Sequence, residues 1–220
     1  MTIDLDLLYQ SMPSLLRGAW VSLQIAAFGC AIGLTFGTLL GIMHAGSNKI
    51  LRILVALYAN ILRGTPMLVQ IAFAYFVLPE VGITMPPFWT AVLAIGLNSS
   101  AYISQIIRSG IASVSKGQIE AARVLGLSSF TITSAIVLPQ ALRIVLPALG
   151  NEFITLIKDS SLASTIGVME LSKEGSIIRS QTYDAFTTYA GVAICYLIMT
   201  TTLSLIVNAL ERRMNKHVAH

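Results

Sequence analysis

The sequence is poor in charged residues. Of its 220 residues, 11% are charged and 55% are hydrophobic, whereas an ordinary soluble domain carries about 25% charged residues. A soluble domain of this length needs a charged surface that this chain cannot supply. A disordered chain would be far less apolar. The mean hydropathy of +0.77 therefore excludes both classes and indicates a protein of the lipid bilayer.

Cysteines and catalytic motifs are also scarce. The two cysteines, Cys30 and Cys195, both lie in apolar stretches and form neither a disulfide framework nor a metal-binding pattern. As small hydrophobic residues they need no further role. The sequence contains no H-E-x-x-H motif and no recognisable arrangement of Ser, His and Asp around a nucleophile. We therefore expect no catalytic residues and no metal site, and the chain is not expected to be an enzyme.

Long apolar runs define the expected architecture. Three runs contain no Lys, Arg, Asp or Glu, and each is longer than the roughly 20 residues that cross a bilayer as a helix. Two further runs have the right length but contain charges, so we expect them to face a polar interior. The sequence predicts an all-α membrane protein with a single transmembrane domain over residues 1–220. The five expected spans are 18–45, 53–79, 86–108, 144–168 and 185–210, and a long loop covers 109–143.

The basic residues predict the orientation. Five spans put the two ends of the chain on opposite sides of the membrane, and loops on the cytoplasmic side are enriched in Lys and Arg. With the C-terminus inside, most of the basic residues fall on the inner face. We therefore expect the N-terminus outside and the C-terminus inside. The inner residues are Lys49, Arg52, Arg108, Lys116, Arg123, Arg143, Arg212, Arg213 and Lys216.

The first expected span carries glycines at a strict period of four. They are Gly29, Gly33, Gly37 and Gly41, which lie along one stripe of a helix and let a neighbouring backbone approach closely. Glycine is also simply common in membrane helices, so the stripe predicts close packing and no chemistry.

The loop between the third and fourth spans resembles two short helices joined by a corner. Ser115 with Gln118 fits a capping box, and Gly126 is a natural helix stop. Ser128 can cap a second short helix that we expect to end near Pro139. Such a rigid elbow suits docking to a soluble partner, and an ordinary cytoplasmic loop is the alternative.

The residues of this loop resemble a known family motif. Glu120-Ala121-Ala122, followed at fixed spacings by Gly126 and by Ile136-Val137-Leu138-Pro139, is similar to the EAA motif of ABC importer permeases. Residues 63–70 and 151–162 resemble the second-span and fourth-span signatures of the polar amino acid uptake family, whose substrates are of the histidine, glutamine and arginine type. The resemblance covers nearly the whole chain.

The resemblance implies a set of partners in a bacterial inner membrane. Permeases of this family are multi-pass dimers, homomeric or heteromeric, that seat their elbows in a cytoplasmic ABC ATPase dimer and receive substrate from an extracytoplasmic binding protein. This chain has no G-x-x-x-x-G-K-[ST] motif, so ATP and Mg²⁺ are expected in the partner ATPase and no cofactor in this chain. No nucleic-acid partner is expected. The expected coupling residues are Glu120, Ala121, Ala122 and Gly126.

Charged residues at bilayer depth predict a substrate site. Such a residue costs about 2.5–3.5 kcal/mol on insertion scales, so it faces a cavity or pairs with another charge. At about 100° per residue, the polar residues of the fourth span share one arc. They are Asn151, Glu152, Thr155, Lys158 and Asp159.

Polar groups of two other spans lie at comparable depth. Together they predict a pocket for a zwitterion, in which Thr65 and a basic group such as Arg63 hold the carboxylate. Asp159 would hold the ammonium group, and Glu152 and Asn98 would read the side chain. Structural ion pairing is the alternative, above all for Lys158 and for Arg63.

The expected function is ATP-driven import of a polar amino acid by alternating access. A carboxylate that reads the side chain favours a basic substrate, namely arginine, lysine or histidine. Glutamine and cystine would fit the same scaffold. A stand-alone channel or secondary carrier with the same polar cavity is the alternative from a different class.

Overall fold

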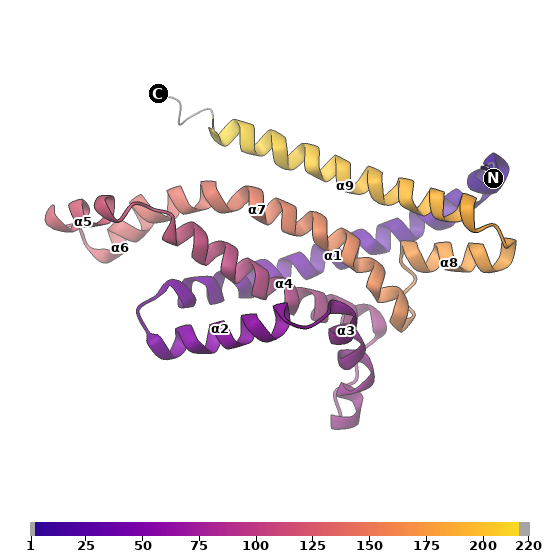
Figure 1. The fold of residues 1–220 in the computed structure, drawn as a ribbon, viewed down its shortest axis with the longest axis horizontal. Helices are drawn as coiled ribbons and strands as arrows, with labels where there is room; N and C mark the ends of the chain where they lie inside the picture. Colours follow the sequence, from indigo (N-terminus) through magenta and orange to yellow (C-terminus); the bar gives the residue numbers. More distant parts are fainter. Residues whose placement is uncertain (1–2, 216–220) are drawn as a thin grey trace.

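The structure, a computed structural model, describes residues 3–215 as an elongated bundle of helices (Figure 1). These residues include no strand, which agrees with the expected all-α class. Lys216, expected on the inner face, lies outside the described residues. The helices are α1 (Leu5–Ala45), α2 (Lys49–Arg63), α3 (Met67–Phe76), η1 (Leu78–Val81), α4 (Pro87–Ala112), α5 (Lys116–Val124), α6 (Ser129–Thr131), η2 (Ile132–Val137), α7 (Leu138–Asp159), η3 (Ser160–Ile166), α8 (Leu171–Thr182) and α9 (Ala185–Asn215).

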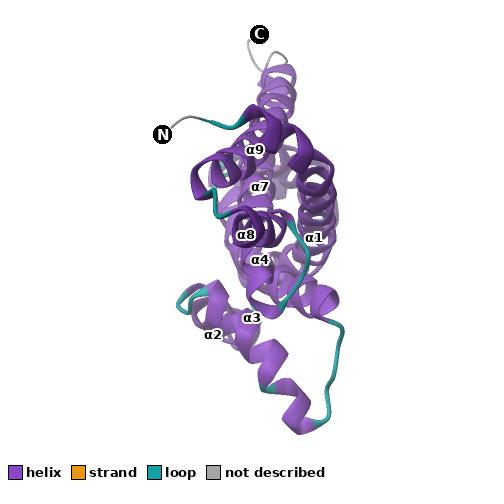
Figure 2. Ribbon diagram, turned by 90° about the vertical axis from the view of Figure 1, so that its right-hand side faces the viewer, coloured by secondary structure: helices purple, strands orange, loops and turns teal. Residues whose placement is uncertain are grey.

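Four continuous helical segments are long and apolar enough to cross a membrane. The second expected span, 53–79, is broken: α2 and the segment Met67–Val81 are bent by 96° relative to each other. The break falls at Gly64-Thr65-Pro66, where proline supplies no backbone N–H. The pair α2 and α3 packs against α4 at one side of the bundle (Figure 2). The four continuous spans are Leu5–Ala45, Pro87–Ala112, Ser129–Ile166 and Ala185–Arg213.

The first helix begins much earlier than expected. Asp4 caps it by accepting a hydrogen bond from the Leu7 backbone N–H at 3.0 Å, so α1 starts at Leu5 and not near residue 18. Its 41 residues extend about 60 Å at ~1.5 Å per residue, twice the ~30 Å of a hydrocarbon core. The helix is therefore longer than a bilayer crossing requires. At its start, the Asp4 backbone N–H donates to the Thr187 hydroxyl of α9 at 3.1 Å.

The glycine stripe of α1 lies directly against α4, and close packing is confirmed. A Cβ atom placed on Gly37 would lie 2.8 Å from the Ser100 carbonyl oxygen, and one on Gly41 would lie 2.9 Å from the Ser104 carbonyl oxygen. The two backbones approach within a distance that only glycine permits, so α1 and α4 form the centre of the bundle.

The expected elbow lies at the end of the molecule opposite the N-terminus (Figure 1). Ser115 is the N-cap residue of α5, but its side chain makes no capping hydrogen bond, so the prediction of a capping box is wrong. The corner itself is confirmed: Gly126 has a φ of +76°, and the Leu127 backbone N–H bonds to the Ala122 carbonyl oxygen at 3.1 Å. Ser128 caps the next helix through the Thr131 backbone N–H at 3.1 Å.

The expected helix end near Pro139 is wrong. The chain is helical from Ser129 to Ile166, because residues Ile132–Val137 form a π-helical turn just before the proline. The Leu138 backbone N–H bonds to the Thr133 carbonyl oxygen, five residues back, and this wider turn accommodates a residue that cannot donate. The fourth span and the second half of the elbow are therefore one helix.

The opposite end of the bundle is held by a buried acid. Glu170, fully buried, caps α8 by accepting bonds from the backbone N–H groups of Ser172 at 2.9 Å and Lys173 at 2.8 Å. Its carboxylate also accepts from the hydroxyl groups of Ser22 at 3.2 Å and Tyr196 at 2.9 Å. One side chain thus joins α1, α8 and α9.

Candidate functional site

A polar pocket lies where the break between α2 and α3 meets α4 and α7. Its volume is about 270 Å³. It brings together four of the five residues expected to bind substrate, from three separate spans, and only Arg63 is not in its lining. The lining residues are Thr65, Met67, Asn98, Tyr102, Glu152, Thr155 and Asp159.

One face of α7 supplies the acidic wall of this pocket. Glu152 and Asp159 are half-buried and lie two turns apart with Thr155 between them. The Ser99 hydroxyl of α4 donates a 2.8 Å hydrogen bond to the Glu152 carboxylate, and Ser99 packs against Gly33 of α1. The glycine stripe therefore places the serine that orients Glu152.

Asn98 has a second role that the sequence did not indicate. Its amide nitrogen donates to the Leu62 carbonyl oxygen at 3.1 Å and to the side-chain oxygen of Gln70 at 3.0 Å. Asn98 thus borders the pocket and also holds the break. Sequence analysis missed Gln70, although it ends the resemblance in residues 63–70, because only the folded chain brings it to Leu62.

Arg63 lies outside the lining of the polar pocket and contacts one of its lining residues. Its guanidinium lies 5.2 Å from the centre of the Tyr102 ring, a cation–π geometry, and Tyr102 lines the pocket. Sequence analysis missed Tyr102, since a tyrosine in an apolar span is ordinary. Contact of Arg63 with a substrate carboxylate stays a prediction.

Lys158 faces a different space. It lines an open groove of about 370 Å³ between α7, α8 and α9, together with Ser172 and Tyr196, whereas its neighbour Asp159 lines the polar pocket. The expected polar arc of the fourth span is therefore divided between two surfaces. Structural ion pairing of Lys158 stays a prediction.

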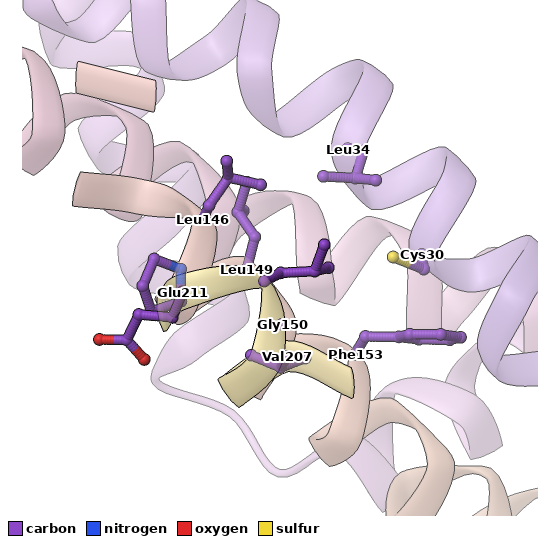
Figure 3. Close-up of a pocket in the computed structure, with 10 residues that line it drawn as sticks. Cys30, Leu34, Leu146, Leu149, Gly150, Phe153, Val207 and Glu211 are labelled. Carbon is purple, nitrogen blue, oxygen red and sulfur yellow. The ribbon is translucent and has the colours of Figure 1, made fainter. Parts of the chain in front are cut away.

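Another cavity, of about 270 Å³, has mainly apolar walls (Figure 3). Leu34 of α1, Phe153 of α7 and Val207 of α9 project into it, and the Glu211 carboxylate points away from Leu34 at its edge. It offers no set of converging polar groups, so the polar pocket is the candidate site for a zwitterion.

The elbow divides its expected coupling residues between core and surface. Ala122 is buried against Val114, Ile132 and Val137, whereas Glu120 and Ala121 are exposed. Ala122 therefore packs the elbow internally, and Glu120 and Ala121 are accessible to a partner.

Three large apolar side chains are exposed at the end of the elbow, and we call them the apolar tip. Val124 is 88% exposed, Leu125 78% and Phe130 80%. A cluster of this kind marks an interaction surface. Sequence analysis missed it because all three residues could equally have packed inside the loop.

The broken span, the polar pocket and the exposed elbow together define a membrane subunit of a transport system. Residues 10–216 match the family described as "Binding-protein-dependent transport system inner membrane component". The chain belongs to this family and is located in the inner membrane.

Named relatives narrow the class. The chain is 40% identical over 216 residues to the glutamine transport system permease protein GlnP of Escherichia coli K12, covering 97% of this chain and 99% of the relative. It is 38% identical over 207 residues to a putative glutamine transport system permease of Rickettsia conorii, covering 94% and 95%.

Solved structures agree with this class. An amino acid ABC transporter with histidines matches with a TM-score of 0.91 and 38% identity, covering 97% of this chain and 100% of that one. The methionine ABC transporter MetNI matches with a TM-score of 0.79 at 21% identity and shows the fold alone. The chain is thus the permease component of an ABC importer for amino acids, not a stand-alone channel or carrier.

Proposed function

We propose that this permease imports glutamine. The observation that carries the proposal is the similarity, over at least 94% of the chain, to relatives named as glutamine permeases. The basic substrate favoured by sequence analysis rested on Glu152 alone, and a carboxylate accepts hydrogen bonds from a carboxamide as well as from a cation.

The polar pocket fits the groups of glutamine. Asp159 would receive the ammonium group, and the positive charge of Arg63 beside Tyr102 would favour the carboxylate nearby. The Thr65 hydroxyl, which donates to the Ile61 carbonyl oxygen at 3.0 Å, would turn from that bond to donate to the carboxylate. Ser99 occupies Oε1 of Glu152, so Oε2 would accept an N–H from the substrate carboxamide. Placement of both carboxylates on one face of α7 supports this orientation.

A cationic amino acid is the second candidate. Two carboxylates, Glu152 and Asp159, in one small pocket would suit a substrate with two positive groups, and a structural neighbour is described with histidines. In this case Glu152 would form an ion pair with the substrate side chain and would be indispensable.

We further propose the coupling scheme of a complete importer. A cytoplasmic ABC ATPase dimer would bind ATP and Mg²⁺ and seat the apolar tip together with Glu120 and Ala121. A second permease subunit and an extracytoplasmic binding protein would complete the assembly, and alternating access would expose the polar pocket to each side in turn. Membership of a binding-protein-dependent family supports this scheme.

The substrate is tested on the permease–ATPase complex without its binding protein, since that protein also selects the substrate. Ligand-induced thermal stabilisation is measured with the twenty amino acids and cystine. Glutamine is expected to stabilise the complex, and arginine, lysine and histidine are not. Stabilisation by arginine without glutamine would contradict the proposal.

Glu152→Gln separates the two candidates further. With glutamine as substrate, the variant retains one acceptor and its affinity for glutamine is expected to fall about tenfold or less, the equivalent of one hydrogen bond of ~1.4 kcal/mol. With a cationic substrate, affinity should fall at least a hundredfold because an ion pair is lost. Glu80→Gln, at an exposed position in η1, is the control and should bind like the wild type.

A further inference from the structure

The break between α2 and α3 leaves a particular backbone group without its helical partner. In an α-helix each carbonyl oxygen accepts from the N–H four residues later, and for Leu62 that residue is Pro66, which has no N–H. The neighbouring carbonyl oxygen, that of Ile61, accepts a hydrogen bond from the Thr65 hydroxyl at 3.0 Å. The Leu62 carbonyl oxygen accepts hydrogen bonds from two side chains that lie outside α2.

These side chains are Gln70 of α3 and Asn98 of α4. The Gln70 amide nitrogen lies 2.7 Å from the Leu62 carbonyl oxygen, 3.1 Å from the Thr65 carbonyl oxygen and 2.8 Å from the Thr65 hydroxyl. The Gln70 side-chain oxygen accepts from the Asn98 amide nitrogen at 3.0 Å. Both ends of the Gln70 carboxamide are thus engaged, and together they join α2, the break, α3 and α4.

Gln70 acts from outside the polar pocket. It lines an apolar cavity of about 440 Å³ and is not in the lining of the polar pocket. Asn98 lines the polar pocket, and Thr65 lines both spaces. Gln70 can therefore influence a bound substrate through these two residues, to whose side chains it is hydrogen-bonded.

We propose that Gln70 is a positioning residue for the transported amino acid. Its carboxamide fixes the break and thereby fixes the positions of Thr65 and Asn98, which line the polar pocket. The inference rests on the proposed function of that pocket as the substrate site. It accounts for a polar side chain in an otherwise apolar helix, and it makes the angle of the break a determinant of substrate affinity.

The first test is Gln70→Leu in the purified permease–ATPase complex. The dissociation constant for L-glutamine, measured calorimetrically without binding protein, is expected to rise at least tenfold, while the yield of assembled complex stays near that of the wild type. Gln105→Leu is the matched control, because it makes the same substitution in α4. The Gln105 amide nitrogen lies 3.3 Å from the His44 ring, away from the pocket. The control should keep the wild-type dissociation constant.

A double-mutant cycle separates positioning from general stability. If Gln70 acts through Thr65, Gln70→Leu should raise the dissociation constant much less in a Thr65→Val background than in the wild type, because effects that share a partner are not additive. Gln70→Glu keeps the shape and the acceptor for Asn98, but it turns a carboxylate oxygen toward the carbonyl oxygens of Leu62 and Thr65, so it should lose at least as much affinity as Gln70→Leu. This variant also serves if Gln70→Leu fails to assemble.

The outcomes are distinct. An unchanged dissociation constant in assembled Gln70→Leu and Gln70→Glu complexes would overturn the inference. So would a loss of assembly with normal affinity in the assembled fraction, or fully additive effects with Thr65→Val. If the wild-type complex binds arginine and not glutamine, the proposed substrate is wrong, and the same cycle measured with arginine still tests Gln70.

Discussion

Two acids, one buried and one half-buried, show how the partners of a residue decide its role. An ionised carboxylate removed from water is stable only where hydrogen bonds replace the lost hydration. Glu170 is surrounded by four donors and is fully buried, so it joins helices and has no oxygen to offer a ligand. Glu152 receives one hydroxyl bond and borders a cavity, so it is available for binding.

Glu170 predicts a pH dependence of stability. Burial raises the pKa of Glu170 above its ordinary value of 4.5, although four hydrogen bonds oppose this shift. An acid whose pKa is raised on folding contributes stability that is complete below its ordinary pKa and is lost as the pH rises through the raised pKa.

The Glu170→Gln variant tests this dependence because it cannot titrate. The melting temperature of the purified complex is measured from about pH 4.5 to pH 8. The advantage of the wild type over the variant should shrink as the pH rises. Parallel pH profiles for the two proteins would contradict the assignment.

At the scale of elements, the sequence indicated which prolines disturb a helix but not whether the helix breaks or continues there. Pro66 marks a break because its missing N–H falls at mid-span, and the structure has the break there. Pro139 offers the same signal, but a π-helical turn absorbs it and the helix continues. Residue spacing does not distinguish the two cases, because the partners that satisfy the freed carbonyl groups, such as Gln70, come from elsewhere in the fold.

The corner of the elbow depends on one residue in the left-handed backbone conformation. Gly126 has a φ of +76°, and a Cβ atom placed on it would meet no other atom within 4 Å, so the requirement is conformational and not steric. Gly126→Ala should destabilise the corner by about 1–2 kcal/mol and reduce association with the ATPase, measured by co-purification. Gly126→Asn should be milder, since asparagine tolerates this conformation. Equal loss in both variants would point to a steric requirement.

The glycine stripe gives a sharper prediction at the same scale. A Cβ on Gly37 would lie 2.8 Å from a backbone oxygen that cannot move aside, so Gly37→Ala should destabilise the protein by about 1–3 kcal/mol. Gly117→Ala is the control, since its nearest neighbour is 3.7 Å away and alanine favours the helix by up to ~1 kcal/mol. Thermal unfolding of the two variants in detergent should therefore shift in opposite directions.

At the scale of the whole molecule, one helix connects the elbow to the polar pocket. The helical segment Ser129–Ile166 carries Phe130 of the apolar tip near one end and Glu152 of the pocket near its middle. At ~1.5 Å per residue these positions are roughly 33 Å apart. On the proposed coupling scheme, a displacement of the elbow by a bound ATPase would therefore be transmitted along this helix to the acidic wall. The sequence did not predict this connection because Pro139 placed the elbow and the span in separate helices.

A substitution in the apolar tip tests whether this surface binds the ATPase. An exposed leucine contributes nothing to the core of the free permease, so Leu125→Ser should leave its melting temperature unchanged. If the tip seats in the ATPase, the loss of one buried leucine side chain from that interface should weaken association by about 2 kcal/mol, roughly thirtyfold.

Co-purification and titration of the ATPase subunit against the reconstituted permease measure this loss. Val81→Ser is the matched control, because Val81 is also apolar and 71% exposed, compared with 78% for Leu125, but lies in η1, away from the elbow. The control should bind the ATPase normally. Because the tip and the acidic wall share one helix, Leu125→Ser should also reduce substrate-stimulated ATP hydrolysis in the complexes that still form. Normal ATPase binding by Leu125→Ser would place the docking surface elsewhere on the inner face.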